Sequence, residues 1–446
     1  MKGLRVQAPD RFNQGQGFKG SRDGGFTPYL ISWNITKRCN LRCSHCYLDA
    51  SELAGSGELS TQEALRLVDE IADINPHTML ILTGGEPLLR GDTLDLAGYA
   101  TRKGLTVVIG SNGTTLDDTV VSRMMEAGVK GVGVSLDSVG PSYHDRFRGL
   151  PGAWERTDKG IDILRQHGLD FQIQVSVTKD NIKELPQIIE YSHRKGARAV
   201  NIFFLVCTGR GQEVTDITPS QYEGVLRYIA EAEREYEGRM MVRARCAPHF
   251  LRVASEINPD SSVLKGATSG CIAGAHYFRI TPVGDITPCP YMPIKAGNIK
   301  ERGLAEVWWN SQVFQPLRNP NYNGRCKNCE FNDICGGCRA RAYAATGDMM
   351  GEDPWCEYEP KVRGQGPAPV PMLRGKQGVK GTAVPFTVRE KKGELIWTKE
   401  ALERLERIPA FLRQMVKKGV EAYARRKGLK EITPEIMKEL RKRAYG

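Results

Sequence analysis

The sequence predicts an α/β protein: a partial (β/α)6 TIM-type barrel, then a cysteine-rich auxiliary domain, then a small helical domain. Three observations predict this architecture. Short apolar runs alternate with amphipathic stretches over the first half of the chain, cysteines gather in two separate fields, and a segment rich in Gly and Pro precedes the C-terminal part. Alternating strands and helices of this length are typical of a parallel sheet with crossover helices.

Each apolar run of strand length is followed by an amphipathic stretch of helix length. The expected strands are Leu30–Ile35, Met79–Thr83, Thr106–Gly110, Gly131–Leu136, Gln172–Val177 and Ala199–Leu205. The expected helices are Thr61–Ile74, Asp92–Lys103, Asp117–Ala127, Trp154–His167, Ile182–Lys195 and Pro219–Glu235. Because active sites of such barrels lie at the C-terminal strand ends, the residues after each strand are the first candidates for function.

Composition predicts the domain boundaries. Gly and Pro interleaved with Lys and Arg indicate a flexible linker at 363–395. Beyond the linker, Thr433 and Pro434 suit the start of a helix. The expected segments are an arm at 1–27, the barrel at 28–240, the cysteine-rich domain at 241–362, the linker, and a helical domain at 396–446 with helices Thr398–Arg407, Pro409–Lys427 and Thr433–Arg443.

Charge and cysteine content bound the class of protein. No apolar run approaches the length that spans a bilayer, and the start lacks the apolar core of a secretion signal. Twelve cysteines without an export signal favour a reducing, cytoplasmic location and metal ligation over disulfides. The net charge of +11 comes entirely from the part after residue 360, where 22 Lys and Arg against 9 Glu give +13, while the rest of the chain is near neutral. Such a tail can meet nucleic acid, a membrane surface or an acidic protein, and charge alone favours none of them.

The most informative motif is Cys39-x3-Cys43-x2-Cys46, which directly follows the first expected strand. Three thiols cannot fill a tetrahedral metal site, but they can hold three irons of a [4Fe–4S] cluster and leave the fourth iron open. An open iron in a reduced cluster can bind and split S-adenosylmethionine (SAM). The alternatives are a structural zinc site and reduced core thiols, although zinc sites prefer C-x2-C pairs with a partner pair nearby.

This motif, with an aromatic residue after its last cysteine, resembles the signature of the radical SAM superfamily. The resemblance implies that the cysteines are catalytic and that Tyr47 lies beside the adenine of SAM. It also implies that the run after the second strand holds the methionine amino group, and that residues ending the third and fourth strands line the ribose and carboxylate. Ordinary turn residues are the alternative for these positions. The candidates are Gly84, Gly85, Glu86, Pro87, Ser111, Asn112, Ser135 and Asp137.

The second cysteine field resembles the auxiliary iron–sulfur domain called SPASM. It departs from the common spacing at Gly336-Gly337, where the family usually has three residues between the cysteines. Zinc sites remain the alternative for its C-x2-C pairs. The resemblance implies one or two auxiliary [4Fe–4S] clusters, the first on Cys326, Cys329, Cys335 and Cys356, the second on Cys271, Cys289 and Cys338 with Cys246 as a possible fourth ligand, and leaves Cys207 as a core thiol.

Further stretches resemble the radical SAM enzymes of siroheme-dependent heme b synthesis and of d-type heme synthesis. They are Trp33–Thr36, Gly57–Ser60, His144–Gly149, Cys246–His249 and Cys335–Tyr343. The resemblance implies oxidative decarboxylation of iron-coproporphyrin propionates to vinyl groups. A 5′-deoxyadenosyl radical would remove a β-hydrogen, carbon dioxide would leave, and an auxiliary cluster would take the remaining electron.

Such a substrate needs cations for its carboxylates. Guanidinium groups pair with carboxylates bidentately, and the candidates are Arg146, Arg148, Arg210, Arg279, Arg339 and Arg341. His249 or Cys246 are candidates to ligate the substrate iron, with a core histidine as the alternative. The resemblance also implies an electron donor such as ferredoxin or flavodoxin.

The C-terminal stretches Trp397–Leu402, Pro409–Leu412 and Val420–Ala424 resemble the small helical domain of light-independent protochlorophyllide reductase. This indicates either a module that works near a tetrapyrrole or one that docks a protein partner. Alternative functions are modification of d-type heme or a siroheme-derived tetrapyrrole, a SPASM maturase of a peptide or protein, and a non-enzymatic iron–sulfur scaffold or electron carrier. The intact Gly84–Pro87 run counts against the scaffold, and a nucleic-acid partner is not expected.

Overall fold

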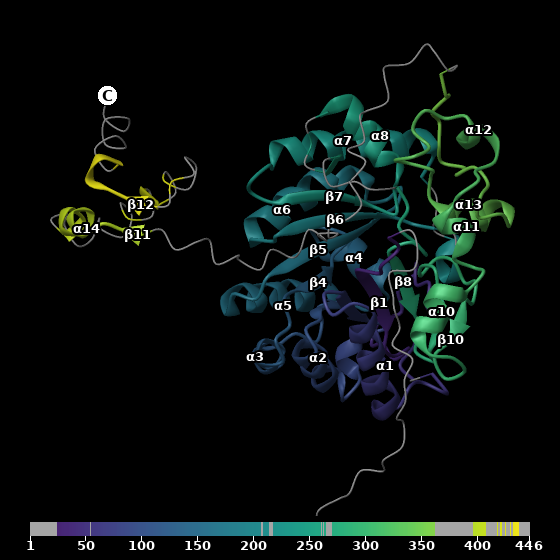
Figure 1. Ribbon diagram of the computed structural model, residues 1–446, viewed down its shortest axis with the longest axis horizontal. Helices are drawn as coiled ribbons and strands as arrows, with labels where there is room; N and C mark the ends of the chain where they lie inside the picture. Colours follow the sequence, from purple (N-terminus) through teal and green to yellow (C-terminus); the bar gives the residue numbers. More distant parts are fainter. Residues whose placement is uncertain are drawn as a thin grey trace, which may run out of the picture. The chain divides into compact units, whose positions relative to one another are not determined.

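The computed structural model divides into two compact units, Met1–Ala383 and Val384–Gly446 (Figure 1). It describes residues 25–53, 55–206, 208–213, 217–259, 261, 263–264, 270–361, 396–406, 417, 420–421, 424, 429 and 431–436. Most of the predicted arm, the linker, Cys207 and most of the predicted helix Pro409–Lys427 lie outside these residues. Among the described residues, no helix is long and apolar enough to cross a bilayer.

A ten-stranded sheet forms the centre of the first unit, in the order β10-β9-β8-β1-β2-β3-β4-β5-β6-β7 (Figure 1). The strands from β8 to β7 in this order are parallel, whereas β9 and β10 run antiparallel to their neighbours. All six predicted strands are present. The strands are β1 Leu30–Asn34, β2 Met79–Thr83, β3 Thr106–Ser111, β4 Val132–Ser135, β5 Phe171–Val177, β6 Ala199–Phe204, β7 Met241–Arg245, β8 Tyr277–Ile280, β9 Asp285–Thr287 and β10 Gly297–Asn298.

Helices follow the strands as expected of crossover connections. The helix after β1 begins at a capping box in which Ser60 and Glu63 satisfy each other's backbone N–H groups, and Thr218 with Gln221 does the same for the helix before β7. The crossover helices are α1 Thr61–Ile74, α2 Thr93–Arg102, α3 Asp118–Glu126, α4 Pro141–Arg148, α5 Ala153–His167, α6 Leu185–Lys195 and α7 Pro219–Glu235.

Side chains alternate between two faces of the sheet, as strand geometry requires. On β1, Ile31 and Trp33 pack into the main hydrophobic core, while Ser32 and Asn34 lie on the opposite face and are also buried. The same alternation holds on β5, where Ile173 and Val175 are core residues between glutamine and serine side chains. The sheet therefore has an apolar face toward the helices and a polar inner face.

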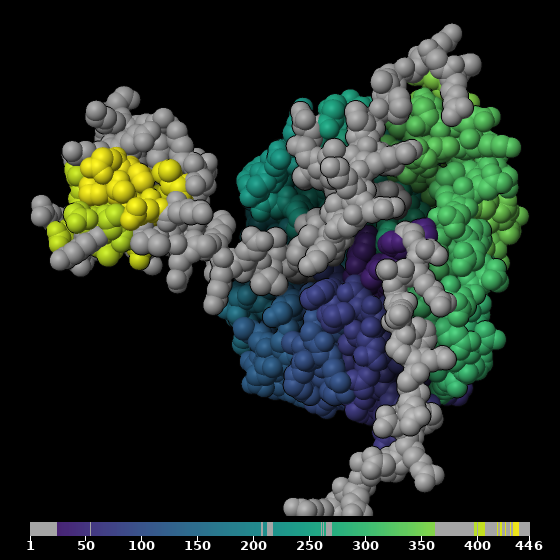
Figure 2. Space-filling view, viewed as in Figure 1, coloured from purple at the N-terminus to yellow at the C-terminus, as the bar shows by residue number. Residues whose placement is uncertain are grey.

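The cysteine-rich part continues the sheet of the barrel. Strand β7 lies beyond the predicted boundary at residue 240, yet it pairs with β6, and β8 pairs with β1. Figure 2 shows the green surface of the cysteine-rich part along the purple surface near β1. Its helices are α8 His249–Ile257, α10 Leu304–Asn310, α11 Gln315–Arg318, α12 Gly324–Lys327 and α13 Arg339–Thr346.

The second unit contains a short parallel pair, β11 Ile396–Trp397 with β12 Glu431–Ile432, and helix α14 Lys399–Glu406. The helix agrees with the prediction for Thr398–Arg407, and residues 434–436 are helical where the third helix is expected to begin. The strand pair was not predicted. A small core of Ala401, Leu405, Val420, Ala424 and Ile432 holds the described part together.

Candidate functional site

The loop that carries the first three cysteines is fixed at both of its ends. The Cys39 N–H donates to the Ser51 carbonyl at 2.7 Å, which closes the loop back on itself. The Arg42 N–H donates to the carbonyl of Arg148 at 3.1 Å, and the Ser44 N–H donates to that of Phe147 at 3.0 Å. The end of α4, a helix that was not predicted, therefore positions the middle of the loop.

Donors surround the sulfur atoms of this loop. The backbone N–H groups of Leu41 and Ala50 point at the Sγ atoms of Cys39 and Cys46, at 3.4 and 3.5 Å. The Arg148 guanidinium lies 3.8 Å from the Sγ of Cys43. Burial raises the pKa of Cys39 to about 12, so this thiol is neutral until a metal replaces its proton. Hydrogen bonds to sulfur are the means by which a protein tunes an iron–sulfur cluster, so the loop suits one.

Asp137 has a partner that the sequence did not indicate. Its carboxylate is fully buried, accepts from the Arg148 Nε at 2.6 Å and accepts from the Ser176 N–H at 2.9 Å. Although burial acts to raise the pKa of Asp137, the charge of Arg148, the two nearby histidines and the Ser176 N–H together hold that pKa below its usual value. Asp137 therefore anchors the arginine beside Cys43, and its role toward a ribose stays a prediction.

The glycines after β2 allow close contact with the cysteine loop. A Cβ at Gly84 would lie 2.5 Å from the Thr36 carbonyl oxygen, and a Cβ at Gly85 would lie 2.3 Å from that of Arg38. The N–H groups of Gly85 and Glu86 donate to these same carbonyls, each at 2.8 Å. The backbone of this run thus packs directly on the residues that lead into Cys39.

The polar candidates at the ends of β2 and β3 meet one another. Glu86 is fully buried and accepts from the Ser111 hydroxyl at 3.0 Å, the Asn112 N–H at 2.8 Å and the Leu88 N–H at 3.3 Å. Burial raises the pKa of Glu86 to about 7 despite these donors. The Asn112 side chain reaches the Sγ of Cys39 at 3.9 Å. The structure thus brings three of the predicted cofactor residues, Glu86, Ser111 and Asn112, together beside the first cysteine.

Tyr47 lies at the junction between the cysteine loop and the inner face of the barrel. Its hydroxyl accepts from the Asn34 side chain at 3.0 Å, and its ring has the Arg279 guanidinium 5.4 Å from its centre. The Tyr291 ring meets it edge-on at 5.3 Å. Ser135, another predicted cofactor residue, ends β4 on the same inner face.

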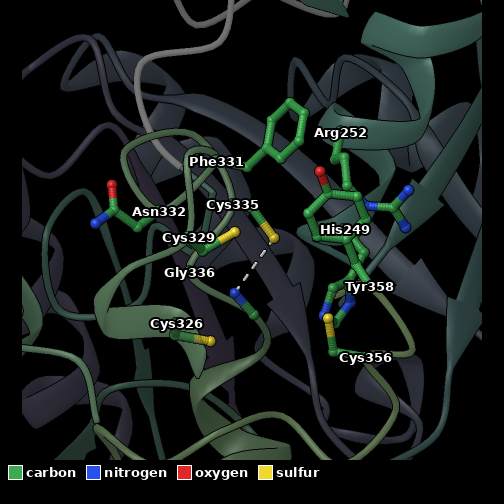
Figure 3. Close-up of a pocket in the computed structure, with 11 residues that line it drawn as sticks. His249, Arg252, Cys326, Cys329, Phe331, Asn332, Cys335, Gly336, Cys356 and Tyr358 are labelled. Atoms are coloured by element: carbon green, nitrogen blue, oxygen red, sulfur yellow. Dashed lines mark hydrogen bonds between the residues drawn. The ribbon is translucent and has the colours of Figure 1, made fainter. Parts of the chain in front are cut away.

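Four of the auxiliary cysteines line one small cavity (Figure 3). They are the quartet predicted for the first auxiliary cluster: Cys326, Cys329, Cys335 and Cys356. His249 and Arg252 also line the cavity. The Gly337 N–H donates to the Sγ of Cys335 at 3.4 Å, the kind of contact made to a ligated sulfur (Figure 3).

The remaining four cysteines lie near one another as well. Burial, together with the neighbouring Cys338 and Cys271, raises the pKa of Cys246 to about 12. Burial and the nearby thiols of Cys271, Cys338 and Cys246 raise the pKa of Cys289 as well. Among the described residues, no group of three or more His, Cys, Asp or Glu side chains is close enough to hold a single metal ion. A four-iron cluster spaces its thiolates more widely, because its own iron and sulfide atoms lie between them.

Most candidate arginines already have protein partners. Arg341 forms a buried ion pair with Asp353 at 2.8 Å, and Arg339 donates to the carbonyls of Met349 and Gly351. Arg210 pairs with Asp49 and donates to the Cys43 carbonyl, which makes it a support of the cysteine loop. Arg146 is exposed on α4. Of the six, Arg279 is the one on the inner face of the barrel.

His249 is a buried core histidine, in agreement with the alternative stated for it. It is 2% exposed, its Nδ1 lies 2.9 Å from the Tyr222 hydroxyl, and burial lowers its pKa to about 4. Sequence reasoning missed two residues of the inner face, Arg243 and Arg245 on β7. The available signal was the alternation of Arg with Val and Ala, which indicates a strand with one polar face.

Comparisons with known proteins agree with this geometry. Residues 33–192 match the family described as the radical SAM superfamily, and residues 271–330 match the iron–sulfur cluster-binding domain SPASM. The chain is 42% identical over 342 residues to the AdoMet-dependent heme synthase of Methanosarcina barkeri, covering 75% of this chain and 97% of that protein. The chain belongs to the radical SAM superfamily.

Other relatives of this radical SAM enzyme extend the comparison. It is 31% identical to the pre-heme d1 synthase of Dinoroseobacter shibae, over 73% of this chain and 85% of that one. The crystal structure of Streptococcus suis SuiB bound to S-adenosylmethionine superposes with a TM-score of 0.62 and 17% identity, covering 74% of this chain and 77% of that one. At this identity, the likeness to SuiB establishes the fold.

The cofactors of this radical SAM enzyme are SAM and iron–sulfur clusters, as predicted. The thiol-lined cavity and the cysteine loop fit such clusters in donor type and surroundings. Residues 397–441 match the family described as the proto-chlorophyllide reductase 57 kD subunit, and this match lies within the second compact unit. The resemblance drawn for the tail is therefore confirmed, while its role remains a prediction.

Proposed function

We propose that this radical SAM enzyme oxidatively decarboxylates propionate side chains of iron-coproporphyrin to vinyl groups, as a step of heme synthesis. The observation that carries the proposal is the 42% identity to an AdoMet-dependent heme synthase along 97% of that protein. The polar, arginine-containing inner face of the barrel gives it physical support, because a substrate with several carboxylates needs cations around it.

The residues of the chain take the following parts in this proposal. Cys39, Cys43 and Cys46 bind three irons of the cluster at the end of β1, and the Glu86 region and Tyr47 hold SAM beside it. SAM and the reduced cluster, when bound, supply a 5′-deoxyadenosyl radical. Holding the substrate carbon close to that radical carries most of the rate in such chemistry. The buried side chains of the inner face, Asn34 and Asn201 among them, exclude bulk water from the site.

The overall change at each propionate is a loss of one hydrogen atom from the β-carbon, of carbon dioxide and of one electron. The electron needs an acceptor. We propose that the two sets of auxiliary cysteines hold the redox cofactors that accept it. A ferredoxin or flavodoxin is the proposed source of the reducing electron. The C-terminal unit is proposed to contact the tetrapyrrole or a protein partner.

Anaerobic incubation with iron-coproporphyrin III, SAM and a reductant tests the proposal. Mass spectrometry should show a product lighter by two formic-acid equivalents, since each propionate loses carbon dioxide and two hydrogens. Formation of 5′-deoxyadenosine beside unchanged iron-coproporphyrin would contradict this choice of substrate. The identity to a pre-heme d1 synthase makes siroheme-derived tetrapyrroles the second candidates, and they belong in the same assay.

A further inference from the structure

The edge strand β7 presents two arginines to the inside of the barrel. These are Arg243 and Arg245. Val242, which precedes Arg243 on the strand, is fully buried in the main core against the helices. Since neighbouring residues of a strand point to opposite faces, Arg243 and Arg245 lie on the polar inner face. Both are half-buried. Two guanidinium groups two residues apart on a barrel interior are uncommon, because burying charge costs free energy.

The register of the sheet relates these arginines to the expected SAM site. Arg243 pairs with Asn201, Asn201 pairs with Gln174, and Gln174 pairs with Ser135. This row crosses four adjacent strands and ends at a residue predicted to contact SAM. Three interstrand steps amount to about 15 Å between the Cα atoms of Ser135 and Arg243. A tetrapyrrole macrocycle can bridge a gap of this order.

A hydrogen bond through the Nε orients the Arg245 guanidinium. Its Nε donates to the Asn201 Oδ1 at 2.8 Å, and the Asn201 Nδ2 donates to the Gln172 Oε1 at 2.7 Å. The two amides thus orient the guanidinium through its Nε. Its charge also acts on Tyr29, which precedes β1: burial raises the pKa of that tyrosine and Arg245 opposes the rise. The charge of Arg245 thus acts on the segment that leads into β1, on the other side of the barrel opening.

Arg279 comes from that other side. It lies on β8 between the core residues Phe278 and Ile280, so it also points inward, and it is 7% exposed. Its Nε donates to the Asn34 Oδ1, and its guanidinium lies 5.4 Å from the centre of the Tyr47 ring. As with Arg245, an asparagine amide orients the group through its Nε.

These three arginines have no acidic partner among the described residues, since no carboxylate there forms an ion pair with any of them. Arg243 contacts the Met241 thioether, and Glu233 is the acid whose charge acts on it. Arg148 and Arg341, by contrast, each have a buried aspartate. An inward guanidinium without an acid is suited to a carboxylate that arrives with a ligand.

We propose that Arg243, Arg245 and Arg279 bind carboxylates of the tetrapyrrole substrate from the inside of the barrel. The inference rests on the proposed function, which it deepens by assigning substrate-binding residues. A guanidinium with its Nε already bonded retains its two Nη groups, which can pair with the two oxygens of one carboxylate.

The first test removes charge from the ligand and leaves the protein intact. Binding of iron-coproporphyrin III and of its tetramethyl ester to the anaerobic, cluster-containing protein is followed through the Soret absorption. The ester has the same macrocycle without carboxylates, so we expect its Kd to be at least tenfold higher. Equal Kd values for acid and ester would overturn the assignment.

The second test changes the arginines one at a time. Arg245→Gln and Arg279→Gln should each raise the Kd for the acid about tenfold and leave the Kd for the ester unchanged, because they remove one charge pair. Arg245→Lys should recover part of the loss. Arg239→Gln is the matched control, since Arg239 is exposed in the turn just before β7. Iron content per chain, unchanged from wild type, identifies variants that fold.

The outcomes separate the two proposals. A wild-type protein that binds no carboxylated tetrapyrrole overturns the proposed function and this inference with it. Wild-type binding of iron-coproporphyrin that is equally strong in folded Arg245→Gln and Arg279→Gln overturns the inference alone. Weakened acid binding with unchanged ester binding supports the assignment of these arginines to the substrate carboxylates.

Discussion

At the scale of single residues, Glu86 combines full burial with three hydrogen-bond donors. Desolvation favours the neutral form and the donors favour the charged form. Desolvation prevails, because the pKa of Glu86 is raised to about 7. An ammonium group that binds here would add the missing positive charge and stabilise the carboxylate, which is the role predicted for SAM.

We therefore expect the affinity for SAM to depend on pH. Below the raised pKa the Glu86 side chain holds a proton, which SAM must displace, so affinity should fall as the pH decreases. With a pKa of about 7, the Kd should rise roughly eightfold between pH 7.5 and pH 6. Calorimetric or EPR titration of the anaerobic protein measures it. Glu86→Gln should bind SAM more weakly and show no pH dependence in this window; a slope retained in Glu86→Gln would contradict the assignment.

The residue scale also shows what sequence can and cannot predict. Cys39, Cys43 and Cys46 can be singled out as candidates from sequence because their spacing is short and they belong to one loop. The partnership of Asp137 with Arg148 and the inward position of Arg245 depend on register between strands distant in sequence. No spacing along the chain encodes that register, so these positions required the folded sheet.

At the scale of elements, the end of β2 and the cysteine loop form one packed unit. Both glycines of the run approach carbonyl oxygens more closely than any Cβ tolerates, and Gly84 has a φ of 152°. The loop path before Cys39 is therefore set by the absence of side chains at the end of the neighbouring strand.

Substitution at Gly85 should displace the loop. In Gly85→Ala the new Cβ meets the Arg38 carbonyl at 2.3 Å, so the backbone leading into Cys39 must move. We expect loss of the iron bound by this loop, about four atoms per chain, and loss of 5′-deoxyadenosine formation. Gly91→Ala is the control, since a Cβ there meets nothing within 4 Å. Normal iron content and SAM cleavage in Gly85→Ala would show that the loop does not depend on this contact.

Elements with a regular apolar period were predictable, and others were not. The core strands and helices such as α1 agree with the sequence prediction because burial imposes periodicity. Helix α4 is short, polar and lacks an apolar period, so it was missed even though it holds the cysteine loop. Strand β7 was missed as part of the barrel because it lies among the turn-rich residues of the cysteine field.

At the scale of the whole molecule, the chain joins a radical SAM and SPASM unit to a second compact unit. The heme synthase of Methanosarcina barkeri aligns over 97% of its own length with only 75% of this chain. The second unit matches a different family. About a quarter of this chain therefore has no counterpart in that relative, and we propose that the second unit is an addition to the catalytic body.

Removal of the tail should leave the catalytic body active. A chain that ends at Ala383 should keep its iron content and its rate of SAM cleavage within about twofold of the full chain, since separate compact units fold independently. Any effect should instead appear in binding of a partner or of the tetrapyrrole. Collapse of iron content or SAM cleavage in this truncated chain would show that the second unit belongs to the active body.

The proposed chemistry depends most on a cluster bound by three cysteines whose fourth iron accepts SAM. EPR spectroscopy of the anaerobically reduced protein, before and after SAM is added, tests it most directly. We expect a changed signal in the wild type and no change in a Cys39→Ser, Cys43→Ser, Cys46→Ser variant, which retains the auxiliary thiols as internal reference. Identical wild-type spectra with and without SAM would contradict it.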